Sequence, residues 1–357
     1  LTDLAQNSSS KYIILTTVNA ATQRIPNRSI LSSATFQADA GRNIDINLLY
    51  SFLSKMGFSK TSTVSEPGDY AVRGGIIDIF APGEVGAVRL DLFGDVLDDI
   101  RQFDPISQRT VSKMSNIRLA PVSEVVFDEA SISRFRQNYR KAFGASHSKD
   151  ILYESVSAGT KYQGVEHWLP FFHEKLETIF DYLPEAAVTL DDNIDAARTS
   201  RWEVIFDQFQ SRKENLDQKN RLDTVYKPIE PEQLYLNEND WKFALSSRTV
   251  LQFSPFPQTP GPNIKDARGT IGKNFSVERQ VENINIFSSL ASYIKSEMET
   301  RPVIIASYTD GARERLRGLL KDEGLDGVNL IENISQVGKM GVFLAVWSLE
   351  QGFQTDK

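Results

Sequence analysis

Four residues in the first third of the chain could bind another molecule through their charge or their ring: Arg73, Arg89, Asp91 and Phe93. The last three alternate along the chain with the apolar residues Val88, Leu90 and Leu92. Side chains of a strand alternate between its two faces, so the apolar row is expected to face a core and the other row to face outward. Guanidinium groups clamp carboxylates, and an exposed ring among charges is typical of a protein-binding surface. The alternative is that Phe93 lies under a neighbouring loop.

Phosphate binding has one weak candidate, the segment Gly269-Thr-Ile-Gly272-Lys273-Asn274. A phosphate-binding loop has the pattern Gly-x-x-x-x-Gly-Lys-Ser/Thr between a strand and a helix. Here Ala267 stands where the first glycine should be, and Asn274 replaces the hydroxyl residue that binds magnesium. The surrounding sequence is rich in proline and glycine, so we expect no nucleotide binding and no cofactor for this chain.

Metal binding and nucleophilic catalysis also lack the residues they need. The only histidines are His147, His167 and His173, and the chain has no cysteine. The six-residue spacing of the last two histidines fits neither a helix turn nor a usual zinc site. No Gly-x-Ser-x-Gly segment is present, and the acidic pairs Asp98-Asp99 and Asp191-Asp192 are typical of solvated charge. We therefore expect a chain without catalytic residues or a metal.

Composition and charge narrow the class of protein further. The chain has 357 residues, a length typical of two to four domains. Its 40% hydrophobic and 24% charged residues are typical of globular protein. No apolar run approaches the roughly 18 residues of a membrane helix, and no leader sequence opens the chain, so we expect a cytoplasmic protein without a membrane partner. The net charge of −7 disfavours DNA binding by this chain alone. Because the chain opens at Leu1 rather than Met, we expect a fragment of a longer protein.

Hydrophobic patterns predict the elements of the first half of the chain. Residues 11–18 are apolar and β-branched, as in a buried strand, and Asn19 should cap a short helix through Arg24. Asp45 should cap a helix through Met56 that ends at Gly57. We predict strands at 62–66, 69–80, 87–93 and 96–104, with a bulge or a close backbone approach at Gly74-Gly75 inside the second strand and a tight turn at Gly94-Asp95.

The second half alternates helices and strands around a linker. We predict helices at 129–143 and 193–215, the latter burying Ile194, Ala197, Trp202, Ile205 and Phe209, and a strand at 186–190. An aromatic cluster lies between them: Trp168, Phe171, Phe172, Phe180 and Tyr182. Residues 254–275 have linker composition. Beyond them we predict one helix from Val277 to Met298, then strand 302–306, helix 310–323 and strands 328–331 and 342–347.

Several segments together resemble a known family. They are Arg73-Gly-Gly-Ile-Ile-Asp-Ile-Phe, Pro82-Gly83, Arg89-Leu-Asp-Leu-Phe-Gly-Asp, Ile100-Arg-Gln-Phe-Asp-Pro, Gly164-Val-Glu-His-Trp and Phe180-Asp-Tyr-Leu-Pro. In this order they are similar to the UvrB-homology module, which the excision-repair protein UvrB shares with the transcription-repair coupling factors. The segment from Gly341 to Phe353 resembles the next domain of the coupling factors, which UvrB does not have.

The resemblance implies a multidomain α/β fold. Residues 1–34 would be the end of a degenerate RecA-like core, which residues 121–253 continue. Residues 35–120, called the hairpin domain from here on, would be the small α+β domain that interrupts this core. Residues 254–275 would be a linker, and residues 276–357 a separate small α/β domain.

The resemblance also implies a partner. In the family this hairpin domain docks onto UvrA, and the matching positions are Arg73, Arg89 and Phe93, with Asp91 as a weaker candidate. We expect Arg89→Ala or Phe93→Ala to abolish UvrA binding with little change in melting. The parent protein would displace RNA polymerase stalled at a lesion, with an ATP- and magnesium-dependent motor on double-stranded DNA outside this chain. The alternative is a UvrB-like, nucleotide-dependent ATPase that senses DNA damage.

Overall fold

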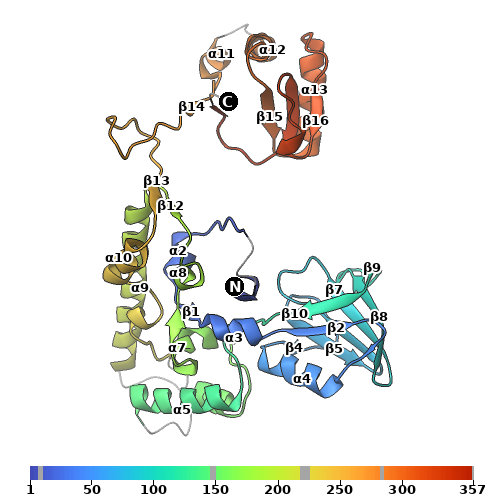
Figure 1. The fold of residues 1–357 in the computed structure, drawn as a ribbon, viewed down its shortest axis with the longest axis vertical. Helices are drawn as coiled ribbons and strands as arrows, with labels where there is room; N and C mark the ends of the chain where they lie inside the picture. Colours follow the sequence, from blue (N-terminus) through green and yellow to red (C-terminus); the bar gives the residue numbers. More distant parts are fainter. Residues whose placement is uncertain (7–10, 145–149, 218–225, 282–284, 356–357) are drawn as a thin grey trace. The chain divides into compact units, whose positions relative to one another are not determined.

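The computed structural model describes residues 1–6, 11–144, 150–217, 226–281 and 285–355. It is a mixed α/β structure with several sheets, which confirms the predicted class (Figure 1). The chain divides into two compact units, Leu1–Pro255 and Phe256–Lys357, and each unit is described by itself.

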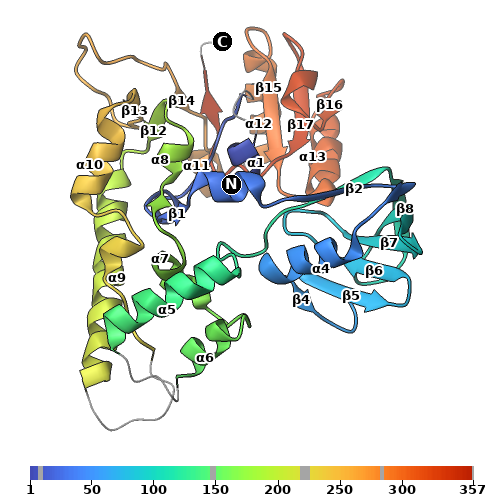
Figure 2. The same cartoon turned by 60° about the horizontal axis from the view of Figure 1, so that its bottom comes forward.

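The hairpin domain is built on the largest sheet of the described residues. Its strands are β3 (Arg42–Asn43), β4 (Ser59–Lys60), β5 (Asp69–Arg73), β6 (Ile76–Ile79), β7 (Ala87–Phe93), β8 (Val96–Phe103) and β9 (Thr110–Met114). They lie in the order β3-β8-β7-β6-β5-β4, and β9 also pairs with β8. Neighbouring strands are antiparallel except β4 and β5. Helix α4 (Ile46–Lys55) packs against one face of this sheet (Figure 2).

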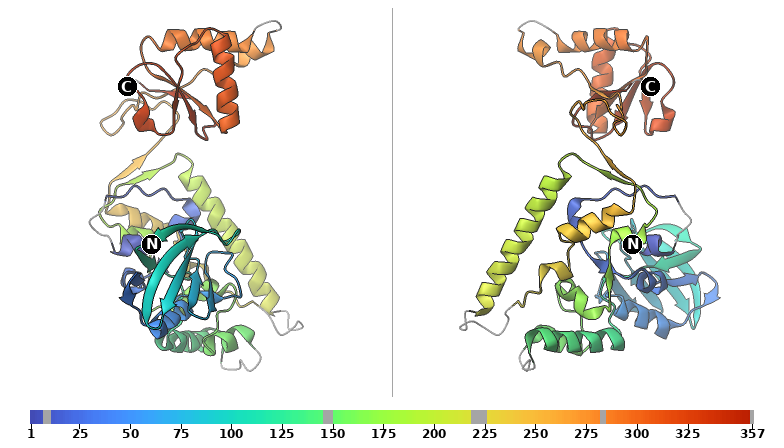
Figure 3. Two further views of the ribbon diagram at one scale, coloured as in Figure 1. Left: turned by 90° about the vertical axis from the view of Figure 1, so that its right-hand side faces the viewer. Right: turned by 60° about the vertical axis from the view of Figure 1, so that its left-hand side comes forward.

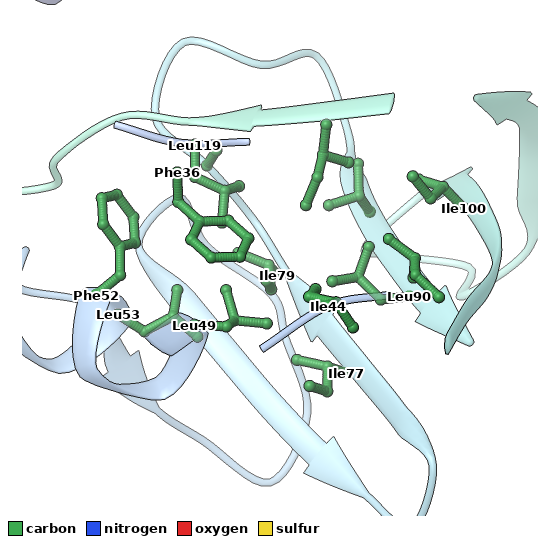
Figure 4. Close-up of a cluster of buried hydrophobic side chains, with 14 of the residues drawn as sticks. Phe36, Ile44, Leu49, Phe52, Leu53, Ile77, Ile79, Leu90, Ile100 and Leu119 are labelled. Atoms are coloured by element: carbon green, nitrogen blue, oxygen red, sulfur yellow. The ribbon is translucent and has the colours of Figure 1, made fainter. Parts of the chain in front are cut away.

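Helix α4 forms where the sequence predicts it. The Asp45 side chain accepts a hydrogen bond from the Leu48 amide at 2.9 Å, which caps the first turn. Leu49 and Leu53, one helical turn apart, are fully buried against Ile77 and Leu90 of the sheet (Figure 4). This apolar layer between helix and sheet fixes which face of the sheet points outward.

The predicted strand 69–80 is wrong, because it is two strands. Gly74 and Gly75 form the tight turn between β5 and β6 rather than a bulge. Gly74 has a φ of +60°, which a side chain disfavours, and a Cβ on Gly75 would lie 2.8 Å from the Leu92 carbonyl oxygen. The register shifts of the sheet lie elsewhere: between β7 and β8, where Asp98 is the extra residue, and between β8 and β9, where Val111 is. The predicted strand 62–66 is also wrong, since that segment is a loop.

The chain enters and leaves the hairpin domain through two paired strands. Strand β2 (Phe36–Asp39) runs antiparallel to β10 (Asn116–Leu119), with Phe36 opposite Leu119. After β10, the Val122 amide donates to the Met56 carbonyl at 2.9 Å, and the Phe127 amide donates to the Lys55 carbonyl at 3.0 Å. The end of α4 is therefore joined to the segment that leaves the domain.

The rest of the first unit is mainly helical. Its helices are α1 (Thr2–Gln6), α2 (Val18–Ala21), α3 (Arg28–Ser33), α5 (Glu129–Phe143), α6 (Ile151–Ser157), α7 (Leu169–Phe172), α8 (Ile179–Tyr182), α9 (Ile194–Asp217) and α10 (Glu238–Ser246). Its described strands form the pairs β1 (Ile25–Pro26) with β11 (Leu176–Glu177), and β12 (Val188–Leu190) with β13 (Val250–Gln252). Figure 3 shows α9 as a long helix on one side of this unit.

The predicted aromatic cluster is distributed over three cores. Trp168, Phe171 and Phe172 pack with α5, whereas Phe180 packs with Trp241 and Tyr182 packs with Leu31 and Ile25. In the first of these cores, Asp150 accepts hydrogen bonds from the Tyr139 hydroxyl at 2.6 Å and from Lys227 Nζ at 2.7 Å. This mostly buried carboxylate is thus paired on both counts, as reduced access to water favours.

Three further predictions for the first unit are wrong: a strand at 11–18, a buried Ala197 and a helix cap at Asn19. Residues 11–17 form no strand, and the Ile13 and Leu15 side chains are 93% and 94% exposed. An apolar segment becomes a buried strand only when a neighbour pairs with its backbone, and no described strand pairs with this one. On α9, Ala197 is exposed although we predicted it to be buried. Thr17, rather than Asn19, caps α2.

The second unit has a three-stranded parallel sheet in the order β15-β17-β16. Its elements are β14 (Thr270–Ile271), α11 (Ser276–Gln280), α12 (Ile286–Glu297), β15 (Val303–Ser307), α13 (Asp310–Asp322), β16 (Asn329–Ile331), β17 (Val342–Val346) and β18 (Phe353–Gln354). The predicted strands and the helix ending before Gly324 are confirmed. The single helix predicted from Val277 is wrong, because Val281 is extended; residues 282–284 lie outside the described residues.

Candidate protein-docking face

All four predicted site residues lie on the outer face of the hairpin-domain sheet, opposite α4. Arg73 on β5 is the cross-strand partner of Ile76 on β6, which in turn lies opposite Asp91 on β7. Directly opposite residues share a face, and so do residues two apart along a strand. The same rule therefore adds Arg89 and Phe93 of β7 to this face, on the side away from the main core.

Half of this outer face is covered by a second, small core. Val64 from the loop after β4 packs there with residues of four strands or strand ends: Ala71, Phe80, Ala87 and Phe103. We did not predict this layer from the sequence, since Val64 lies in the segment that we predicted to be a strand. It divides the outer face into a covered half and an open half. The open half is the part outside this layer, which carries Ile76, Asp91 and Phe93.

Arg89 lies at the boundary between the two halves. Its Nε and Nη2 atoms donate to the two carboxylate oxygens of Asp78 at 2.7 and 2.8 Å, and its guanidinium carbon lies 4.8 Å from the centre of the Phe103 ring. The Asp78 side chain is 5% exposed and that of Arg89 is 22% exposed. The hydrogen bond to Asp78 raises the pKa of Arg89, although partial burial opposes it. Arg89 thus faces outward, as the alternation predicted, but it is partly buried and already paired within the domain.

Phe93 is the most exposed apolar residue of the open half. It is 82% exposed, next to the β7–β8 turn, and it lies opposite Val96. Ile76, two residues away across the sheet, is 37% exposed. The loop alternative for Phe93 is therefore excluded. Exposed apolar side chains with charged neighbours are a common feature of binding surfaces.

A row of charged side chains continues from Phe93 along the same face of β7, β8 and β9. Asp91 pairs with Arg101 of β8, and Asp99 lies 3.7 Å from Arg101 Nε and 3.1 Å from Lys113 Nζ. Asp91 is therefore already paired within the domain. We did not predict Arg101, although it belongs to the segment Ile100-Arg-Gln-Phe, because only the strand register places it opposite Arg89.

Arg73 is exposed and holds the loop that covers the second small core. Its Nη2 atom donates to the Ser62 carbonyl and, at 2.7 Å, to the Thr63 hydroxyl. The guanidinium is thus oriented by the same loop that supplies Val64. Two arginines fixed by contacts within the domain and one exposed ring form a preorganised surface, which loses little conformational freedom when a partner binds.

The other candidates from the sequence occupy structural positions. Lys273 pairs with Glu278 at 2.6 Å, and its segment contains strand β14, which pairs with β18. His173 is buried and bonds to the Glu124 carbonyl oxygen at 3.1 Å, and burial lowers its pKa. Burial and the neighbouring Arg212 likewise lower the pKa of His167. His147 lies outside the described residues.

Metal binding and membrane spanning would each need a further feature in the described part of the chain. No group of three or more His, Cys, Asp or Glu side chains is placed there to hold a metal ion. No helix in the same residues is long and apolar enough to cross a membrane.

The fold is that of a small α+β domain with one partly uncovered sheet face. Residues 36–125 match the family model of the UvrB interaction domain. The whole chain is similar to the transcription-repair-coupling factors of Haemophilus influenzae, at 28% identity over 97% of the chain, and of Escherichia coli, at 28% over 96%. That of Myxococcus xanthus is 32% identical over 57% of the chain.

The resemblance to the coupling factors that the sequence analysis identified is therefore confirmed. The match extends over nearly the whole chain, whereas the chain spans 29% of the length of the Haemophilus and Escherichia proteins. These relatives connect the chain to DNA repair and to transcription-coupled repair.

Proposed function

We propose that this chain is the part of a transcription-repair coupling protein that recruits UvrA, and that the open half of the outer face is the docking surface. Phe93 would insert into a pocket of UvrA, and Arg73 and Arg89 would bind its carboxylates. The observation that carries this proposal is the 82% exposure of Phe93 on the same sheet face as two oriented arginines, inside a domain that matches the UvrB interaction domain.

The proposed role of the chain is binding without catalysis. ATP hydrolysis with magnesium, movement on double-stranded DNA and displacement of RNA polymerase would belong to other parts of the full-length protein, which would act in the cytoplasm. We further propose that residues 1–34 and 121–253 are a degenerate RecA-like core that supports the hairpin domain. The pairing of Lys273 with Glu278 supports a non-catalytic role, because this lysine is already neutralised.

A binding experiment with one matched control tests the proposal. Phe93→Ala should abolish co-elution of the chain with purified UvrA and leave thermal unfolding unchanged, since an exposed ring contributes little to folding. Phe243, on α10 outside the hairpin domain, is 80% exposed, so Phe243→Ala removes an equally exposed ring. Binding should survive in this control. UvrA binding by Phe93→Ala at the wild-type level would refute the proposal.

A further inference from the structure

Asp78 is a buried carboxylate on the outer face of the sheet, at the boundary of the open half. It lies on β6 directly opposite Arg89, and the whole residue is 4% exposed. Both of its oxygens accept hydrogen bonds from the same guanidinium. Burial of a carboxylate is costly unless it is paired, so this position requires Arg89 to remain in one orientation.

The contact with Asp78 uses one side of the guanidinium and leaves another side available. Asp78 binds Nε and Nη2, which form one edge of the planar group. A guanidinium has five N–H donors, so the two on Nη1 and the second on Nη2 remain along the end of the side chain. Two parallel donors of this kind match one carboxylate. The Phe103 ring beneath the guanidinium, at 4.8 Å, holds the plane of the group.

We propose that Asp78 is a positioning residue of the docking face, which holds the Arg89 guanidinium so that its free end meets a carboxylate of UvrA. This inference rests on the proposed function and adds a residue to it. An arginine that is already fixed loses little rotamer freedom on binding. Because the Asp78–Arg89 pair has no net charge, long-range attraction of polyanions is weak, and the pair favours a protein carboxylate over a nucleic-acid backbone.

The test removes the charge of Asp78 and keeps Arg89. Asp78→Asn has nearly the same volume but cannot accept both hydrogen bonds as a carboxylate does. We expect UvrA affinity, measured by titration calorimetry at a temperature where the variant is folded, to fall about tenfold or more. If Asp78→Asn does not fold, Asp78→Glu keeps the charge but displaces the guanidinium by one methylene, and the same loss is expected.

Repeating the Asp78→Asn substitution in an Arg89→Lys variant separates positioning of Arg89 from general destabilisation of the domain. In Arg89→Lys the side chain keeps its charge, so binding stays measurable, but an ammonium has no planar fork to orient. If Asp78 acts through the Arg89 fork, Asp78→Asn should weaken binding much less in this background. An equal fold-loss in both backgrounds would assign Asp78 a purely structural role and overturn the inference.

Asp150 gives a matched control outside the hairpin domain. Its side chain is 15% exposed and pairs with Lys227, so Asp150→Asn also removes a paired, mostly buried carboxylate. This variant should be less stable and still bind UvrA like the wild type. If the wild-type chain itself does not bind UvrA, the docking function is rejected. Loss of binding in Phe93→Ala together with wild-type affinity in Asp78→Asn would reject only the role of Asp78.

Discussion

Arg89→Ala should destabilise the hairpin domain, because it leaves the Asp78 carboxylate buried without its partner. Removing one member of a buried ion pair costs about 3–5 kcal/mol. The Arg89 side chain is 22% exposed, so water can reach the vacated position and the lower limit of about 3 kcal/mol applies. The sequence led us to expect nearly unchanged melting for both Phe93→Ala and Arg89→Ala; with Asp78 beneath Arg89, we now expect it only for Phe93→Ala.

Thermal unfolding followed by circular dichroism measures this cost. If the first unit, Leu1–Pro255, unfolds as a whole, a loss of about 3 kcal/mol lowers its Tm by roughly 6–12 °C. Arg89→Ala combined with Asp78→Ala should be more stable than Arg89→Ala alone, since no charge is then left unpaired. A Tm of Arg89→Ala within about 2 °C of the wild type would contradict the argument, because it would mean that Asp78 is well solvated without Arg89.

Two further predictions concern the segment that leaves the hairpin domain. Burial and repulsion by Glu166 raise the pKa of Glu124 above 4.5, so the folded state binds its proton more tightly than the unfolded state and loses stability as the pH rises. Glu124→Gln should therefore increase Tm at pH 7, with the gain disappearing near pH 4; a constant gain would disprove this cause. Gly57 has a φ of +83°, and an added Cβ would lie 2.9 Å from the Ser123 Cβ, so Gly57→Ala should cost about 1 kcal/mol or more in urea unfolding. An unchanged urea midpoint would exclude this steric contact.

The sequence predicted best those features that depend on near neighbours along the chain. The alternation in β7 correctly separated buried Val88 and Leu90 from outward Arg89 and Phe93. The cap of α4 by Asp45 was also correct, since capping involves residues three apart.

Features that depend on strand pairing could not be predicted in this way. The Asp78–Arg89 pair follows from the register of β6 and β7, which are joined by a separate loop, and the interpretation of Gly74-Gly75 as a bulge also hid the face on which Asp78 lies. With those glycines recognised as a turn, Asp78 would have been assigned to the face of Arg73. Residues 11–18 have the composition of a buried strand, but composition does not identify a pairing partner.

The antiparallel pairing of β2 with β10 has a consequence for the origin of the hairpin domain. Phe36 and Leu119 lie side by side, so the two ends of the domain emerge next to each other. A module with adjacent ends can be inserted at one point of a host chain without separating the residues on either side. The same geometry would let whole docking modules be exchanged between proteins as single pieces during evolution, with the host core left undisturbed.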